Sequence, residues 1–229
     1  MPPLSAQPPS VRPPSTQPPA SSGPRLPRNS AATKLRLLDA AEHEFAARGF
    51  TGVRLRDIAD AASVQPALIH HYFGDKQGLY RAVLDRALLP TSTESWTLLG
   101  SGLDIEGLLD GFADMLLRFH AAHHNLLAML RHEAMTGSDV FSEIMRERTL
   151  PVIDALRAVI VEVQARGGIR ADLAPEEIIV AGMSMVAYPF LESRMLQVVM
   201  PSVVVSDEES LARRKKAILA ILLEGIRLR

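Results

Sequence analysis

Residues 55–80, which read LRDIADAASVQPALIHHYFGDKQGLY, decide the fold. Apolar residues recur there at spacings of three and four, first over 55–62 and again just after Pro66. Pro66 suits the first position of a helix, where its missing N–H is not needed. Gly74 is placed to end the second helix, and Asp75 is placed to cap the next one. The stretch therefore predicts two helices of about two turns each, joined by a tight turn, and then a longer helix.

Two adjacent histidines lie in the second short helix. If Ile69 faces the core, a step of about 100° per residue places Phe73 close to it on the wheel. The same step turns His70 and His71 about 100° to 160° away, onto the polar face with Ala67. A histidine on an apolar face is usually a core residue, but these two are predicted to face outward. Their open face is thus available to a metal, a proton or a nucleic acid.

A longer helix precedes this pair. Leu35, Leu38 and Ala41 keep the helical spacing, and Thr33 is a candidate N-cap. Gly49 follows Arg48 as a C-terminal glycine, so we expect the helix to end near Arg48. A long helix followed by two short helices and a tight turn is the plan of a helix-turn-helix unit.

These residues resemble the DNA-binding domain of the TetR family of bacterial transcriptional repressors. The resemblance rests on TKLRLLDAAEHEFAARGF followed by RLRDIADAASVQPALIHHYFGDKQGLYRAVL, and it covers Thr33 to about Leu89. It implies an all-α protein with a helix-turn-helix domain over 30–89 and a helical ligand-binding and dimerisation domain over 90–229. Ser63 departs from the family pattern, because glycine is usual at this turn, so we expect a strained or altered turn there.

The resemblance also implies which residues face DNA. His70 stands where tyrosine is most frequent in the family, so the operator sequence does not follow from the resemblance. Lys76 lies beside the free N–H groups of a helix start and would hold a phosphate. Arg56 could instead pair with Asp60 one helical turn away. The candidate DNA-binding residues are Arg54, Arg56, Gln65, Pro66, Ala67, His70, His71, Tyr72 and Lys76.

Charge is divided unevenly along the chain, although the net charge is −1. Residues 1–89 carry 11 Lys and Arg against 7 Asp and Glu, a balance that favours a polyanionic partner. Residues 1–29 repeat Pro-Pro with Ser, Gln and Ala between, so we expect a disordered segment. This segment is a solubilising tail or a basic arm in which Arg25 and Arg28, with Lys34, follow a DNA backbone. A proline-rich ligand for SH3-type domains is a third alternative.

The rest of the chain is predicted to be helical. We expect Pro151 and Pro189 to bend the helices that contain them. The last two helices are apolar enough to need further cover, which a second subunit would give in a four-helix interface, so we expect a homodimer. The alternative is that both helices are buried within a single chain. The expected spans are 104–122, 124–136, 139–166, 176–199 and 208–227.

A helical ligand domain would enclose its effector with adaptable apolar side chains and a few polar groups. Each candidate could equally be a core residue. The candidates are Trp96, Phe112, Met115, Phe119, Met129, Arg131, Met183 and Tyr188, with Met185, His132 and Glu133 as further possibilities.

Other classes of function find less support. His120 and His124 have the i, i+4 spacing of a zinc site, and Glu133 could add a carboxylate, so a helical metal-binding protein or enzyme is one alternative. No catalytic motif accompanies them, so we expect no enzyme and no cofactor. The chain has no cysteine, no signal peptide and no apolar run long enough for a membrane, which favours the cytoplasm. We therefore expect a repressor that a small hydrophobic effector releases from a pseudo-palindromic operator. A DNA-binding activator without a ligand is the second alternative.

Overall fold

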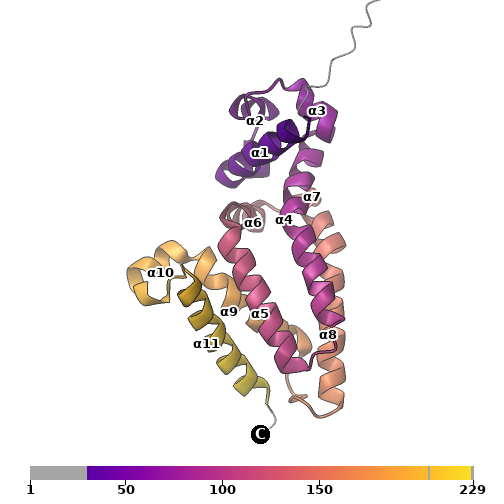
Figure 1. Cartoon of the computed structure of the whole chain (residues 1–229), viewed down its shortest axis with the longest axis vertical. Helices are drawn as coiled ribbons and strands as arrows, with labels where there is room; N and C mark the ends of the chain where they lie inside the picture. The colour runs from indigo at the N-terminus through magenta and orange to yellow at the C-terminus, as the bar shows by residue number, and fades with distance from the viewer. Residues whose placement is uncertain (1–29, 206, 228–229) are drawn as a thin grey trace, which may run out of the picture.

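The computed structural model describes residues 30–205 and 207–227, and within these ranges every regular element is a helix (Figure 1). The predicted all-α fold is confirmed. The proline-rich segment 1–29, with Arg25 and Arg28, lies outside the described residues. The helices are α1 (Ser30–Gly52), α2 (Leu55–Ala61), α3 (Ala67–Phe73), α4 (Lys76–Leu99), α5 (Ile105–Ala122), α6 (His124–Thr136), α7 (Asp139–Ile144), a π-helical turn (Met145–Thr149), α8 (Leu150–Ala165), α9 (Pro175–Leu191), α10 (Ser193–Val199), a 3-10 turn (Pro201–Val203) and α11 (Glu208–Ile226).

The first helix breaks where the sequence predicts. Gly49 has a φ of 68° and a ψ of 173°, a conformation that glycine adopts without a steric penalty and that interrupts α1. The predicted N-cap is wrong, because α1 begins at Ser30 and Thr33 is buried one turn inside it. Leu37, Ala41 and Phe45 recur along the buried face of the helix.

The turn between α2 and α3 carries the strain expected of a non-glycine residue. Ser63 has a φ of 53°, and it is the one residue other than glycine with positive φ in the described chain. Pro66 comes directly before α3, and Gly74, with a φ of 79°, ends this helix. Asp75 then caps α4, since its Oδ1 accepts a hydrogen bond from the Gly78 N–H at 2.8 Å.

The fourth helix extends beyond Leu89, where the expected DNA-binding domain ends. It continues through Pro90 to Leu99, so one helix crosses the domain boundary expected at 89/90. Pro90 is exposed, so water can satisfy the carbonyl that its missing N–H leaves free. The hydroxyl of Thr93 donates to the Leu89 carbonyl at 2.9 Å in the next turn. Tertiary packing of α4 on α5 and α8 thus outweighs the local preference of proline.

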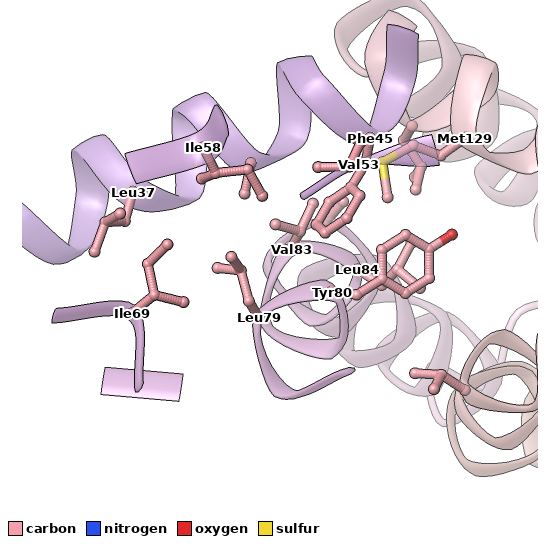
Figure 2. Packing of buried hydrophobic residues seen from close by; sticks show 14 of the residues in the cluster. Leu37, Phe45, Val53, Ile58, Ile69, Leu79, Tyr80, Val83, Leu84 and Met129 are labelled. Carbon is pink, nitrogen blue, oxygen red and sulfur yellow. The ribbon is translucent and has the colours of Figure 1, made fainter. Parts of the chain in front are cut away.

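The core of the helix-turn-helix unit extends beyond α1–α4. Figure 2 shows Met129 of α6 beside Phe45 and Val53, near Tyr80 of α4. Val140 of α7 belongs to the same buried cluster. The DNA-binding unit and the start of the C-terminal helices therefore share one core, in which α6 packs against α1 and α7 against α4.

The C-terminal helices follow the predicted spans with two additional breaks. The span 139–166 contains a π-helical turn just before Pro151. The span 176–199 breaks at Glu192, three residues after Pro189. Helices α5, α9 and α11 pack on one another, with α4 and α8 alongside (Figure 1). Across residues 30–205 and 207–227, none of the helices combines the length and apolarity needed to cross a membrane.

Candidate functional site

The outer face of α3 is open to solvent at the end of the molecule (Figure 1). Ile69 is fully buried and fixes the helix on the core, while His70 and His71 are exposed, as the sequence predicts. Nδ1 of His70 lies 2.8 Å from the Gly74 carbonyl oxygen. A carbonyl can only accept, so Nδ1 is the donor and Nε2 remains free for a partner. Gln65, Pro66 and Ala67 lie exposed at the start of the same helix.

Basic side chains surround this face. Arg54 is exposed; its backbone carbonyl accepts from the N–H groups of α2, but its side chain has no hydrogen-bond or ion-pair partner among the described residues. Arg56 reaches Asp60 only at 3.9 Å, and both side chains are mostly exposed, so this pair holds Arg56 weakly. Lys76 lies with Nζ 4.7 Å from the Phe50 ring centroid, and burial lowers the pKa of its ammonium group. Lys34 lies 5.8 Å from the ring centroid of Phe73.

Tyr72 has a different environment from its neighbours. Its ring packs on the core, and its hydroxyl is buried without a hydrogen-bond partner among the described residues. The hydroxyl of this candidate DNA-binding residue is therefore not available to DNA in this conformation. The reason is position, since Tyr72 lies three residues after Ile69 on the helix and shares part of its inward face.

A buried hydrogen-bond network joins the DNA-binding unit to α6 and α7. The Tyr80 hydroxyl donates to Oε1 of Glu133 at 2.6 Å, and the Ser138 N–H donates to Oε2 at 2.7 Å. Glu133 is only 4% exposed. Burial and the bond to Glu133 raise the pKa of the Tyr80 phenol, so it stays protonated as the donor. Glu133, expected as a polar group for the ligand, instead anchors α6 to α4.

The C-terminal helices enclose an elongated cavity with a volume of about 260 Å³. Its wall is apolar apart from six residues, and it is formed mainly by α4, α5, α8, α9 and α11. Of the eight principal candidates for ligand contact, four line it: Phe112, Met115, Phe119 and Met183.

The other four candidates lie elsewhere. Trp96 is 47% exposed, and the cavity is lined by its neighbour Ser95. Met129 is buried in the core shared with Phe45, because α6 turns this side chain toward α1. Arg131 is exposed and donates to the Leu191 carbonyl, and Tyr188 is 46% exposed on α9. Apolarity alone could not separate the inner face of each helix from its outer face.

Composition alone does not identify the polar residues of the cavity wall. Ser95 lies with Ser92 and Thr91 on the inner face of α4, in the segment between the expected DNA-binding domain and the first expected helical span at 104–122. Extending the helical periodicity of the sequence past Pro90 would have identified this face of α4. The polar lining residues are Thr91, Ser92, Ser95, His120, Arg148 and Thr149.

The histidines at 120–124 do not form the expected i, i+4 pair. Helix α5 ends at Ala122, and His123 has a φ of −118° and a ψ of 54°, so His120 and His124 belong to different helices. Nδ1 of His120 is bound to the Leu116 carbonyl at 2.6 Å, and His124 is exposed. No group of three or more potential metal ligands occurs in the described parts of the chain. The geometric basis for the metal-protein alternative is therefore lost.

Helices α9, α10 and α11 carry a second feature, a set of exposed large apolar side chains. They belong to elements that the sequence predicts as a dimer interface. Within α11, Ile218 and Leu222 are buried, whereas Ile221 is 60% exposed, so the apolar side predicted for this helix is split between core and surface. The exposed set is Val180, Met183, Tyr188, Met195, Val198, Val199, Met200 and Ile221.

A short exposed helix held by a tight turn against a small helical core defines a helix-turn-helix protein. The family model for bacterial regulatory proteins of the tetR family matches residues 37–83, and the model for the tetracyclin repressor-like C-terminal domain matches residues 107–221. The chain belongs to the TetR family of transcriptional regulators.

Curated relatives include repressors. The chain is 36% identical over 108 residues to the HTH-type transcriptional repressor SCO4008 of Streptomyces coelicolor, covering 47% of this chain and 53% of that protein. It is 30% identical over 97 residues to the repressor KstR2 of Rhodococcus jostii, covering 42% and 48%. The match therefore spans about half the length of these two relatives.

Solved structures share the fold. The ketosteroid transcriptional regulator KstR2 of Mycobacterium tuberculosis superposes with a TM-score of 0.66 at 21% identity, over 86% of this chain and 95% of that chain. The fatty acid degradation regulator FadR of Bacillus halodurans gives 0.63 at 19% identity, over 84% and 98%.

Proposed function

We propose that the protein is a transcriptional repressor that binds a pseudo-palindromic operator as a homodimer and is released by a small hydrophobic effector. The observation that carries this proposal is the open face of α3, where buried Ile69 positions exposed His70 and His71 among basic side chains. Similarity to proteins named as repressors supports repression over activation.

The contacts to DNA divide into two groups. His70, His71 and Ala67 face outward on α3, which would enter the major groove and read base edges or the methyl group of thymine. Arg54, Arg56 and Lys76 flank the helix and would hold phosphates, which fixes the register without reading sequence. Gln65 and Pro66 bring the start of α3 to the groove, and the ring of Tyr72 packs between α3 and the core.

The effector would act through the packing of the helices. The cavity is lined by α4 and α5, and α4 continues without interruption into the DNA-binding unit. Tyr80 and Glu133 fix α6 to the same helix. A ligand that shifts α4 within the C-terminal bundle would therefore change the separation of the two α3 helices in the dimer and weaken DNA binding by linkage.

The exposed apolar residues of α9, α10 and α11 would form the dimer interface. Val198 and Val199 are 82% and 60% exposed, and neighbouring Met200 is 48% exposed. A large exposed apolar surface is typical of protein–protein contact.

The experiment is a gel shift with fragments from upstream of the gene itself. We expect His70→Ala to weaken binding by about five- to 150-fold if the ring reads a base, which corresponds to roughly 1–3 kcal/mol. Lys76→Ala should weaken binding to every fragment alike and reduce the salt slope by about 1. His124→Ala, an exposed histidine on α6, is the matched control. Sedimentation should show the same oligomer for all variants, and unchanged shifts for His70→Ala and Lys76→Ala would contradict the proposal.

A further inference from the structure

The cavity follows α5 over most of its length. Lining residues occur on this helix from Ile105 to His120, fifteen positions apart, which corresponds to about 22 Å at 1.5 Å per residue. A volume of about 260 Å³ spread over that length makes the cavity narrow. This shape suits an extended chain better than a compact ring system.

One end of the cavity is aliphatic. Ile105 lies at the start of α5 and packs against a cluster of isoleucine and leucine side chains from α8, α9 and α11. Such an environment favours a hydrocarbon chain and offers no compensation for a buried polar group. The cluster residues that also line the cavity are Ile160, Ile169, Ile178, Ile179, Leu222 and Ile226.

The polar side chains of the wall come from the opposite part. His120 lies in the last turn of α5, and the hydroxyl of Ser92 lies 3.4 Å from the carbonyl oxygen of Arg148. Ser95 contacts the sulfur of Met115 at 3.7 Å. The cavity is thus divided along its length into an apolar part and a weakly polar part.

Two groups of the polar part, the His120 ring and the Ser95 hydroxyl, offer acceptors because each already donates to a backbone carbonyl. Nδ1 of His120 donates to the Leu116 carbonyl, which leaves Nε2 as an acceptor in the neutral ring. Burial lowers the pKa of His120, so the ring is neutral near pH 7. The Ser95 hydroxyl donates to the Thr91 carbonyl at 2.8 Å, so its oxygen is left with lone pairs.

The charge at this end is already balanced. Arg148 is the one lysine or arginine among the described lining residues, and its Nε lies 3.0 Å from Oδ1 of Asp85. A ligand carboxylate would find no unpaired cation here and would lose its hydration. A ligand with an uncharged donor would not meet this penalty.

We infer that the cavity binds an uncharged single-chain amphiphile of the long-chain alcohol class, with its chain among the isoleucines and its hydroxyl at the His120 end. This inference rests on the proposed function, since it names the chemical class of the effector. The hydrocarbon chain of the ligand would lie along the aliphatic part of the cavity. Its hydroxyl would donate a hydrogen bond to the acceptors at the His120 end.

The test compares three ligands of equal chain length with the full chain, each below its aggregation threshold: decan-1-ol, decanoate and decyl methyl ether. Isothermal titration and thermal unfolding measure binding. We expect decan-1-ol to bind at least about tenfold more tightly than decanoate, because the carboxylate is desolvated without a partner. Equal or tighter binding of decanoate, or no binding of decan-1-ol, would overturn the inference.

Variants of His120 test where the hydroxyl of the ligand binds. His120→Phe keeps a ring but removes the acceptor. It should therefore weaken the binding of decan-1-ol about three- to tenfold and leave the binding of decyl methyl ether unchanged. His120→Gln keeps an acceptor and should retain most of the affinity, and His124→Phe is the surface control. Loss of affinity for both ligands alike in a folded His120→Phe protein would count against the placement.

A gel shift on the same samples separates the two proposals. If the protein binds its upstream DNA but not decan-1-ol, the ligand inference fails and the repressor proposal stands. If decan-1-ol binds as expected but the protein ignores the DNA, the ligand inference stands and the repressor proposal fails. Release of bound DNA by decan-1-ol would support both.

Discussion

Two buried tyrosine hydroxyls have opposite environments. The Tyr80 hydroxyl donates to Glu133, which is itself buried, whereas the Tyr72 hydroxyl is buried without a partner among the described residues. Removing a hydrogen bond leaves the other buried group unsatisfied, but removing an unpaired hydroxyl relieves a desolvation penalty. The same substitution should therefore have opposite effects at the two positions.

We expect Tyr80→Phe to lower the free energy of unfolding by about 1–3 kcal/mol, because Glu133 loses one of its two donors. Tyr72→Phe should be neutral or stabilising. Urea denaturation of the two single variants measures both changes. A loss at Tyr72 equal to that at Tyr80 would contradict the assigned environments.

Single residues show what the sequence could and could not establish. The positive φ of Ser63 and the outward position of His70 follow from the family pattern and from helical periodicity, and the structure confirms both. The burial of Met129 against Phe45 depends on how α6 packs on α1, which no local pattern contains. The pairing of Tyr80 with Glu133 joins residues 53 positions apart and is equally invisible locally.

At the scale of elements, α4 departs most from the sequence-based expectation. A domain boundary is expected at 89/90, yet the helix runs through Pro90 to Leu99 and supplies both a wall of the cavity and a core helix of the DNA-binding unit. Long-range packing decides the outcome, since Ser95 faces Met115 of α5 and Arg148 pairs with Asp85. Helices α5 and α11 keep their predicted bounds within two residues, and the side chains of Asp104 and Asp207 cap them. Helix α6 also keeps its predicted bounds, although no side chain caps its start.

Pro90→Ala tests the continuity of α4. Proline is about 3 kcal/mol less favourable than alanine inside a helix, while the unfolded chain gains up to about 1 kcal/mol of flexibility on its removal. We therefore expect the variant to unfold at a free energy roughly 2 kcal/mol higher, as chemical denaturation would show. A marked loss of stability would mean that the chain needs a break at this position.

At the scale of the whole molecule, the proposed binding to an operator requires two subunits. One chain has one α3 helix, and a pseudo-palindromic site needs two at a fixed separation. The exposed apolar residues of α9, α10 and α11 are the surface proposed to supply the second subunit.

Ile221→Glu places a charge in the proposed interface. We expect the variant to stay folded, since Ile221 is 60% exposed, and to shift toward the monomer by sedimentation velocity. Val161→Glu on α8, where the side chain is 51% exposed, is the matched control and should leave the oligomer unchanged. Equal effects of the two substitutions would argue against this interface.

Hydroxyl-radical footprinting on the DNA upstream of the gene tests the central claim that paired α3 helices read an operator. We expect two protected patches related by approximate dyad symmetry, with half-sites about 34–36 Å apart or a multiple of that spacing. Protection should fade with His70→Ala and persist with His124→Ala. A single patch, uniform protection along the fragment, or a footprint unaffected by His70→Ala would contradict it.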